Sequence, residues 1–404
     1  MKKKILILAS WYPSDASPVN GIFIQEQART LSREHEVVVL APRLVGWREI
    51  IKRGIGPRSH AENRAGIMVY RERVLSLMPR APALAYPRWV RAARRSLRMV
   101  LRTLGKPDLI HAHVVLPAGW AAVMLGKEFD IPVVLTEHSS PFAIHLRTVR
   151  QRRWVKETLS RVNAPIAVSP SLAKQITDFQ KDVTVSVIGD LVKTDFFVPI
   201  QSRPKDASQT NDSTRSSTTH FLSIALLSRQ KGLSYLLHAA KLLIERGITA
   251  FDLTIGGDGV ERPALERLSQ SLGLTKQCRF AGLLNQEEVR QWMQQCDVFI
   301  MPSLHETFCI VLGEAMACGK PVIATRCGGP EFVVTPETGV LVDVANPEAL
   351  ANAMSDFILR RTKYDPTRIR QSVVSRFGDE VFLRNVSAVY EKVRADAVQS
   401  RSHP

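Results

Sequence analysis

The sequence predicts an α/β protein made of two doubly wound, parallel-sheet domains. Three observations lead to this fold class. Short aliphatic runs alternate with helical patterns along the chain, which is typical of parallel strands joined by crossover helices. One polar stretch, at 201–219, interrupts this alternation. The length of 404 residues is enough for about two domains, each with a core of its own.

The first half of the chain contains six aliphatic runs that we expect to form strands buried on both faces of a sheet. They span 4–9, 36–41, 108–112, 132–136, 164–168 and 184–188. Helical patterns lie between several of these runs, for example at 21–33, 87–102 and 117–127. We therefore predict an N-terminal domain over 1–200.

A second domain is expected over 220–378, because the alternation of strands and helices resumes there. The Ser- and Thr-rich segment 201–219 has no large aliphatic residue and is expected to be a flexible surface segment. The tail 379–404 has a helical pattern and is expected to cross back to the first domain. Two such domains would face each other across a cleft, and parallel sheets bind ligands at their carboxyl edges.

Composition excludes several protein classes. Hydrophobic residues make up 45% and charged residues 23% of the chain, which is unlike a disordered or collagen-like protein. The apolar stretch near the N-terminus, 5–9, is too short for a signal peptide, and no apolar run approaches the roughly 18 residues of a membrane-spanning helix. The five cysteines are odd in number and lack a Cys-x-x-Cys spacing, which argues against disulfides or a zinc site. We expect a cytoplasmic protein.

Positive charge is concentrated in the first half of the chain. The net charge is +17, and residues 1–200 hold 31 Lys and Arg against 16 Asp and Glu. One predicted helix carries a row of arginines, which we call the arginine stripe: Arg91, Arg94, Arg95, Arg98 and Arg102. Four further arginines add to this surface: Arg147, Arg150, Arg152 and Arg153. A solvated face or a nucleic-acid contact are alternatives, but no acid lies in the run and no nucleic-acid motif accompanies it. We therefore expect contact with an anionic membrane surface or an anionic acceptor.

The clearest candidate for a functional site is 302–342, where a predicted strand ends and a helix follows. His305 and Glu306 lie in the intervening loop, and the helix is expected to begin near Thr307. The first N–H groups of a helix have no internal partner, and the helix dipole favours anions there. A phosphate site is therefore expected from the backbone N–H groups of Phe308, Cys309, Ile310 and Val311. Glu314, two turns into this helix, would flank the same ligand as Glu306.

This segment resembles the C-terminal signature of retaining glycosyltransferases of family 4, whose Glu-x7-Glu element matches Glu306 and Glu314. The resemblance extends over nearly the whole chain. Further matching segments are 20–24 (NGIFI), 111–113 (HAH), 136–138 (TEH), 231–232 (KG) and 256–259 (GGDG). Together these motifs are specific, although each alone is weak. The resemblance implies the two-domain GT-B architecture, with an acceptor-binding first domain over 1–200 and the nucleotide-sugar bound by the second domain over 220–378.

The resemblance also implies a role for each donor-binding residue. Gly21 would let the backbone approach the diphosphate, because a glycine has no side chain to keep it away. Lys231, with the helix start, would neutralise the leaving diphosphate in place of a metal, so neither a metal nor a cofactor is expected. Glu306 would bind the sugar hydroxyls and Glu314 the ribose hydroxyls. Gly257 is assigned to nucleotide contact.

The resemblance also implies roles for two histidines of the first domain, one at the donor sugar and one at the acceptor. His138 would contact the donor sugar, and the backbone carbonyl beside it would help to stabilise positive charge at the anomeric carbon. His113 would line the cleft and bind the acceptor, whereas His111 is at least as well explained as a structural residue. No residue stands out as a nucleophile, so the resemblance implies a front-face substitution with retention.

The sequence departs from the family pattern at two places. The family arginine that precedes Lys231 by five residues is Leu226 here, and Arg229 is the candidate to supply its charge. The usual Pro-Asn-Gly-Val between the domains is replaced at 189–192 (GDLV). We expect transfer of a sugar, from a UDP-sugar by our guess, to a lipid-linked or glycan acceptor. A sugar-nucleotide 2-epimerase, and a basic membrane-binding protein with a vestigial sugar site, are the alternatives.

Overall fold

The computed structural model describes residues 2–15, 17, 19–53, 58–76, 78, 81–200, 218–359 and 364–402. It has two compact units. Unit 1 comprises Met1–Leu191 with Phe382–Pro404, and unit 2 comprises Val192–Val381. Unit 1 therefore ends before the domain boundary that we expected at residue 200. The expected flexible segment 201–219 lies outside the described residues up to residue 217, and its last residue opens a strand of unit 2.

Unit 1 is built on a nine-stranded sheet with the order β3-β5-β2-β1-β6-β7-β8-β9, and with β4 paired to β5. Its strands are β1 (Lys4–Ala9), β2 (Glu36–Leu40), β3 (Arg43–Gly46), β4 (Ser59–Arg64), β5 (Ile67–Ser76), β6 (Leu109–His113), β7 (Val133–Glu137), β8 (Ala164–Ala167) and β9 (Ser186–Val187). All pairs are parallel except β4–β5. Strand β1 pairs with both β2 and β6, and this is the point where the strand order reverses. Parallel sheets of this kind bind ligands at that point.

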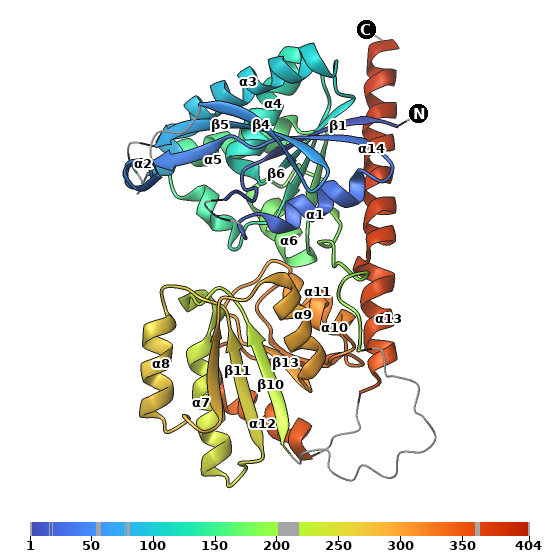
Figure 1. Ribbon diagram of the computed structural model, residues 1–404. Helices are drawn as coiled ribbons and strands as arrows, with labels where there is room; N and C mark the ends of the chain where they lie inside the picture. Colours follow the sequence, from blue (N-terminus) through green and yellow to red (C-terminus); the bar gives the residue numbers. More distant parts are fainter. Residues whose placement is uncertain are drawn as a thin grey trace. The chain divides into compact units, whose positions relative to one another are not determined.

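Helices cover both faces of the unit 1 sheet (Figure 1). They are α1 (Ile22–Leu31), α2 (Trp47–Arg53), α3 (Tyr86–Thr103), α4 (Trp120–Phe129), α5 (Val149–Arg161), α6 (Pro170–Phe179) and α14 (Asp379–Ser402). Three short turns of helix also occur: η1 (Pro82–Ala85), η2 (Val115–Gly119) and η3 (Phe142–Leu146). Side chains of α1 and α14 share one core with alternate residues of β1, such as Ile5 and Ile7. Helices α3 and α4 contact the strands from the other face. The sheet is therefore doubly wound.

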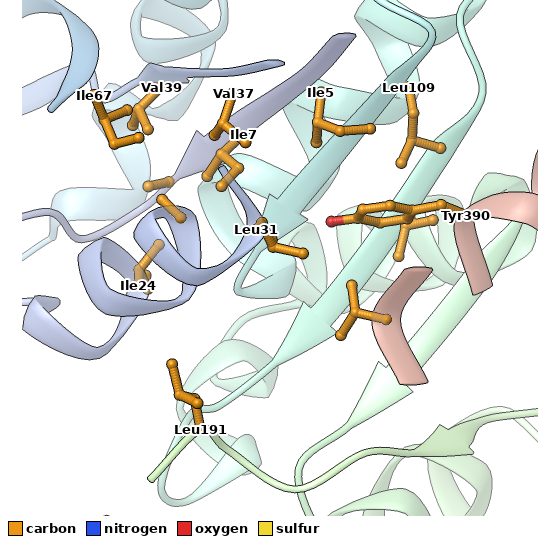
Figure 2. Close-up of a cluster of buried hydrophobic side chains, with 14 of the residues drawn as sticks. Ile5, Ile7, Ile24, Leu31, Val37, Val39, Ile67, Leu109, Leu191 and Tyr390 are labelled. Atoms are coloured by element: carbon orange, nitrogen blue, oxygen red, sulfur yellow. The ribbon is translucent and has the colours of Figure 1, made fainter. Parts of the chain in front are cut away.

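The tail helix α14 belongs to the core of unit 1. Tyr390 is fully buried there and packs with residues of β1 and β6, including Ile5 and Leu109 (Figure 2). The Tyr390 hydroxyl lies 2.6 Å from His111 Nδ1. The helix thus supplies both apolar area to this core and a hydrogen-bond partner to His111.

Unit 2 is built on a six-stranded, fully parallel sheet with the order β12-β11-β10-β13-β14-β15. The strands are β10 (Thr219–Ile224), β11 (Phe251–Gly256), β12 (Cys278–Gly282), β13 (Val298–Met301), β14 (Val322–Thr325) and β15 (Gly339–Val342). The helices are η4 (Arg229–Lys231), α7 (Leu233–Glu245), α8 (Arg262–Ser271), α9 (Gln286–Gln295), α10 (Ile310–Ala317), α11 (Pro330–Val333), α12 (Pro347–Leu359) and α13 (Pro366–Phe377). Helices α7, α8 and α12 share the core of one face, and α9 and α10 contact the strands from the other. The order reverses between β10 and β13.

The predicted fold class is therefore confirmed for each unit. The strands that the sequence did not predict are β3, β4 and β5, all within 43–76. Strand β4 is mostly exposed, and β5 mixes charged with apolar residues. A search for continuous aliphatic runs does not find such strands, because they are not apolar on both faces.

Candidate active site

Lys231 and Glu306 form an ion pair at the strand-order reversal of unit 2. Lys231 ends the short helix η4, which follows β10, and Glu306 lies in the loop after β13. Because β10 and β13 are parallel neighbours, both loops leave the same edge of the sheet. Lys231 Nζ lies 2.6 Å from Glu306 Oε1, and the Ser303 hydroxyl donates to the same oxygen at 2.8 Å. The structure thus brings together two residues that the sequence assigned to one donor site.

The charge of Lys231 is maintained by this pairing. Burial alone would lower the pKa of the Lys231 ammonium, but the Glu306 carboxylate beside it outweighs that effect and raises the pKa above its ordinary value. The Glu306 side chain is only 8% exposed, so its charge is shielded little by solvent. Lys231 is therefore a cation near neutral pH, positioned by the segment that follows β10.

The backbone around Glu306 is fixed by hydrogen bonds to the loop after β14. Glu306 N donates to Cys327 O at 3.3 Å, and Gly329 N donates to Glu306 O at 2.8 Å. A Cβ on Gly329 would lie 2.4 Å from the backbone nitrogen of Phe308, so the approach requires glycine. The Gly-Gly pair at 328–329 therefore positions the Glu306 loop.

The predicted helix start near Thr307 is wrong. Helix α10 begins at Ile310, and Cys309 precedes it in a left-handed conformation with φ of 76°. Of the four N–H groups expected to point out of the first turn, only those of Ile310 and Val311 belong to the helix. The N–H groups of Phe308 and Cys309 belong to the preceding loop, where the Phe308 ring packs against Phe377 with centroids 5.0 Å apart.

Glu314 lies just over one turn into α10, rather than the two turns that we predicted. The side chain is half-buried. Burial raises the pKa of the Glu314 carboxyl to about 7, although the Lys193 cation opposes the rise. Near neutral pH both the protonated and the ionised form of Glu314 are therefore expected to be populated.

Two further donor-site candidates follow β10 and β11. Gly257 has φ of 115°, and a Cβ there would lie 1.9 Å from the carbonyl oxygen of Ala225, so only glycine fits. Arg229 lies in η4 and is exposed, and within the described part of the chain no ion pair engages its guanidinium. Leu226, at the position of the missing family arginine, is 67% exposed. Arg229 is therefore the cation nearest in sequence to Lys231 that remains open to an anion.

His138 lies just after β7 in unit 1 and is held by two partners. Its Nδ1 lies 3.0 Å from Asp190 Oδ1, and its Nε2 lies 3.0 Å from His113 Nδ1. Asp190 Oδ1 also accepts a hydrogen bond from Gln27 Nε2 at 2.9 Å. The imidazole is only 7% exposed, so its orientation is fixed before any substrate arrives.

His113 is fully buried beneath His138, whereas we expected it to line a cleft and contact the acceptor. Burial lowers the pKa of the His113 imidazole well below its ordinary value, and the neighbouring histidines lower it further. The ring is therefore neutral and has no exposed atom to offer an acceptor. Its Nδ1 lies beside His138 Nε2, and its ring also packs against His111 with centroids 4.4 Å apart.

His111 has the structural role that we considered for it. Its Nδ1 lies 2.6 Å from the Tyr390 hydroxyl, and its Nε2 lies 2.8 Å from the Thr136 hydroxyl. Gly21, by contrast, lies at the start of α1 with φ of 74°. A Cβ at this position would lie 2.6 Å from the Trp11 carbonyl, so glycine is required here by the protein's own backbone.

Comparison with known proteins decides the family. The chain matches the family model described as glycosyl transferases group 1 over residues 206–371, and the model described as glycosyltransferase family 4 over residues 21–196. The chain belongs to the group 1, family 4 glycosyltransferases. The glycosyltransferase is also 28% identical to one from Bacillus subtilis strain 168 that is named for teichuronic acid biosynthesis, over 88% of this chain and 89% of that protein.

A second relative and two solved structures are also similar to this chain. A D-inositol 3-phosphate glycosyltransferase from Corynebacterium diphtheriae is 30% identical over 66% of this chain and 65% of its own length. Sucrose-phosphate synthase from Thermosynechococcus elongatus matches 98% of this chain and 100% of its own, with a TM-score of 0.77 and 22% identity. HepE from Anabaena, in complex with UDP, matches 97% and 100% with a TM-score of 0.71 and 18% identity. The structural likeness shows the GT-B fold.

The arginine stripe of the glycosyltransferase has acidic partners, although the sequence suggested none. Arg94 Nε donates to Glu128 at 2.7 Å, and Arg98 contacts the same carboxylate at 3.4 Å. Arg95 pairs with Glu72 of β5. These acids come from α4 and β5, and so they are distant from the run in sequence. The inference that the stripe's charge is uncompensated is therefore wrong for Arg94, Arg95 and Arg98.

Four residues of the two sites were not found from sequence: Ser303, Lys193, Asp190 and Gln27. A signal existed for Asp190, since it lies in the segment 189–192 that departs from the family pattern. Within the described residues, no three His, Cys, Asp or Glu side chains form a group that could hold a metal ion. The helices of the described residues also include none that is long and apolar enough to cross a bilayer.

Proposed function

We propose that the glycosyltransferase moves a sugar, with retention, from a UDP-sugar to a lipid-linked or glycan acceptor in cell-surface polysaccharide biosynthesis. The observation that carries this proposal is the Lys231–Glu306 pair at the strand-order reversal of unit 2. UDP as the nucleotide is supported by HepE, which has been solved with UDP and with UDP and glucose. A cell-surface glycan is supported by the relative named for teichuronic acid biosynthesis.

In the proposed reaction, Lys231 binds the diphosphate and stabilises the negative charge that develops on it as the bond to the sugar breaks. The N–H groups of Ile310 and Val311 and the guanidinium of Arg229 add to this stabilisation. Gly257 keeps the loop after β11 clear of side chains beside the nucleotide. These groups take the part that a metal ion plays in other transferases, so the proposal includes no metal and no cofactor.

The two glutamates divide the recognition of the donor. Glu314 accepts hydrogen bonds from the ribose hydroxyls, and Glu306 accepts them from the sugar hydroxyls. Glu306 Oε1 already receives two hydrogen bonds, from Lys231 and Ser303, so the proposal assigns sugar contact to the remaining oxygen, Oε2. In this proposal Lys231 therefore also orients Glu306.

In unit 1, His138 contacts the donor sugar, and its backbone carbonyl stabilises positive charge at the anomeric carbon. Both ring nitrogens of His138 already have partners, which supports contact through the ring edge and the backbone. Gly21 brings the start of α1 toward the diphosphate. Because the proposed reaction retains configuration and no side chain is assigned as a nucleophile, the acceptor attacks from the face that the diphosphate leaves.

Binding of nucleotides tests this proposal first. UDP, GDP and ADP are titrated into the purified protein by calorimetry, and the titrations are repeated with Glu314→Ala. We expect UDP to bind most tightly and the variant to lose binding at least tenfold, while Glu245→Ala, at an exposed position on α7, binds as the wild type does. If none of the three nucleotides binds, the donor site is vestigial and the proposal fails.

The alternatives predict different outcomes. A sugar-nucleotide 2-epimerase would convert the donor sugar in the absence of an acceptor, whereas a transferase requires one. A basic membrane-binding protein would tolerate Glu306→Ala without loss of its function, whereas a transferase would lose transfer and keep any membrane binding.

We also propose that the glycosyltransferase works at the cytoplasmic face of the membrane and contacts anionic lipid through its arginine stripe. The test changes four arginines to glutamine: Arg91, Arg94, Arg95 and Arg98. Binding to vesicles that contain anionic lipid is expected to fall in this variant, and to fall for the wild type as salt is added. Equal binding by the two proteins would reject this location. Part of the stripe is already neutralised by Glu128 and Glu72, so the expected loss is modest.

A further inference from the structure

Unit 1 contains a cavity of about 880 Å³ at its strand-order reversal. The wall includes the residues that follow β1, such as Ser10 and Trp11, and the cis-proline turn at Leu116 and Pro117. These segments leave the carboxyl ends of β1 and β6, where parallel sheets bind ligands. The volume lies within the range of about 300–1,000 Å³ that is typical of small-molecule sites. The cavity is therefore large enough for a ligand of its own, apart from the donor site in unit 2.

The wall of this cavity is aromatic and positively charged. Four aromatic side chains line it: Trp11, Tyr12, Tyr86 and Trp89. Four arginines line it as well: Arg43, Arg71, Arg147 and Arg150. None of the described lining residues is acidic. Flat aromatic faces suit the apolar faces of sugar rings, and clustered guanidinium groups suit an anion.

The four arginines differ in whether an acidic side chain already pairs with them. Arg71 is buried, donates to Glu62 at 2.6 Å and also bonds to the Pro13 carbonyl, and Arg43 pairs with Glu49. Arg147 and Arg150 are exposed. No ion pair engages either of them among the residues that the structure describes. They flank Thr148, whose hydroxyl caps α5, so both guanidinium groups lie beside the positive end of a 13-residue helix.

A buried polar atom without a partner also belongs to this wall. Tyr12 is 5% exposed, and its hydroxyl has no hydrogen-bond partner among the described residues. The Arg71 guanidinium lies 5.7 Å from the centre of its ring. A buried hydroxyl without a hydrogen bond is unfavourable, so this atom is expected to bond to a ligand.

The cavity is connected to the loop that carries His138. His145 lines the cavity, and its Nε2 lies 2.7 Å from the Ser139 hydroxyl. Glu137 holds this loop by accepting hydrogen bonds from the backbone N–H groups of His138 and Ser139, at 3.0 and 2.7 Å. The cavity wall is therefore joined by hydrogen bonds to the loop that carries His138, the residue that the proposed reaction places at the sugar.

We infer that this cavity binds the acceptor, and that the acceptor is an anionic sugar whose phosphate or carboxylate pairs with Arg147 and Arg150. Its ring packs on the aromatic wall, and the Tyr12 hydroxyl donates to or accepts from one of its oxygens. This inference rests on the proposed function, because it names the class of molecule that accepts the transferred sugar.

Three probes of similar size test the inference: glucose 6-phosphate, glucuronate and glucose. Each is titrated into the full-length protein at low ionic strength by calorimetry. We expect at least one anionic probe to bind at least tenfold more tightly than glucose. A preference for glucose 6-phosphate identifies a phosphate on the acceptor, and a preference for glucuronate identifies a carboxylate.

Variants then assign the site. The double variant Arg147→Gln/Arg150→Gln is expected to lose the tenfold preference, and Tyr12→Phe is expected to weaken binding while it keeps the aromatic ring. The matched control is Arg29→Gln/Arg88→Gln, which removes two exposed charges from unit 1 outside the cavity wall and is expected to bind as the wild type does. Equal binding of all three probes, no binding of either anion, or an unchanged preference in the cavity variant would overturn the inference.

UDP binding is measured on the same samples, so that the two proposals are tested separately. If UDP binds and the anionic probes show no preference, only the inference about the acceptor fails. If UDP does not bind, the proposed function itself fails.

Discussion

The pKa of Glu314 leads to a quantitative prediction for nucleotide binding. Burial raises this pKa to about 7 in the free protein. If the ribose hydroxyls donate to the carboxylate, then UDP binds the ionised form and affinity scales with the ionised fraction. That fraction falls from about nine tenths near pH 8 to about one tenth near pH 6, so affinity should fall about tenfold, or about 1.4 kcal/mol.

The perturbation that tests this reasoning is Glu314→Gln, which keeps the shape of the side chain and removes its titration. UDP affinity is measured by calorimetry from about pH 6 to pH 8 for both proteins. The difference between the two profiles is the quantity of interest, because the phosphates of UDP also titrate and affect both proteins alike. We expect the wild type to lose about tenfold more affinity than the variant toward low pH.

Lys193 supplies the control. Its cation lowers the pKa of Glu314, so Lys193→Met should raise that pKa and move the wild-type profile to higher pH. Parallel profiles for the wild type and Glu314→Gln would refute the assignment of Glu314 to the ribose, whatever the affinity of UDP.

Three further predictions follow from packing and burial. Gly232→Ala should lower the free energy of unfolding more than Gly247→Ala, because both have positive φ but only at Gly232 would a Cβ meet backbone, 2.1 Å from a carbonyl oxygen. Asp190→Ala should lower the free energy of unfolding of unit 1 in urea by about 2 kcal/mol, since His138 loses its partner, and should leave UDP affinity unchanged. The control Asp182→Ala, at an exposed position, should change neither quantity. Burial raises the pKa of all five thiols, so iodoacetamide should label the native protein slowly near pH 8 and the unfolded protein fast.

Equivalent positions of the two units hold the candidate sites. In unit 2 the Lys231–Glu306 pair lies where β10 meets β13, and in unit 1 His138 and the cavity lie near the ends of β1, β6 and β7. In both, the first strand of the sheet pairs with strands that extend the sheet in opposite directions. The loops that follow these strands diverge, which leaves room for a ligand.

The sequence by itself determined the class of the fold and most of its strands. Strand β1 has the limits, 4–9, that its aliphatic run predicted. A strand buried on both faces must be apolar throughout, so a few consecutive residues are enough to recognise the strand and its limits. The resemblance to family 4 likewise rested on local motifs, and the family assignment is confirmed.

Local sequence did not determine the start of α10. The residues from Thr307 onward contain no local signal that marks where the loop ends and the helix starts, and the helix begins only at Ile310. The close approach of Gly329 to the backbone of Phe308 explains this difference, because it fixes the loop before the helix in a non-helical conformation. That contact joins two loops that are distant in sequence.

Tertiary structure alone decided the partners of each charged residue. The sequence named Lys231 and Glu306, but only the parallel pairing of β10 and β13 brings their side chains within 2.6 Å. It showed the arginine stripe without acids, whereas α4 and β5 supply Glu128 and Glu72. Electrostatic interactions depend on distance in space and on burial, and neither is a property of a local segment.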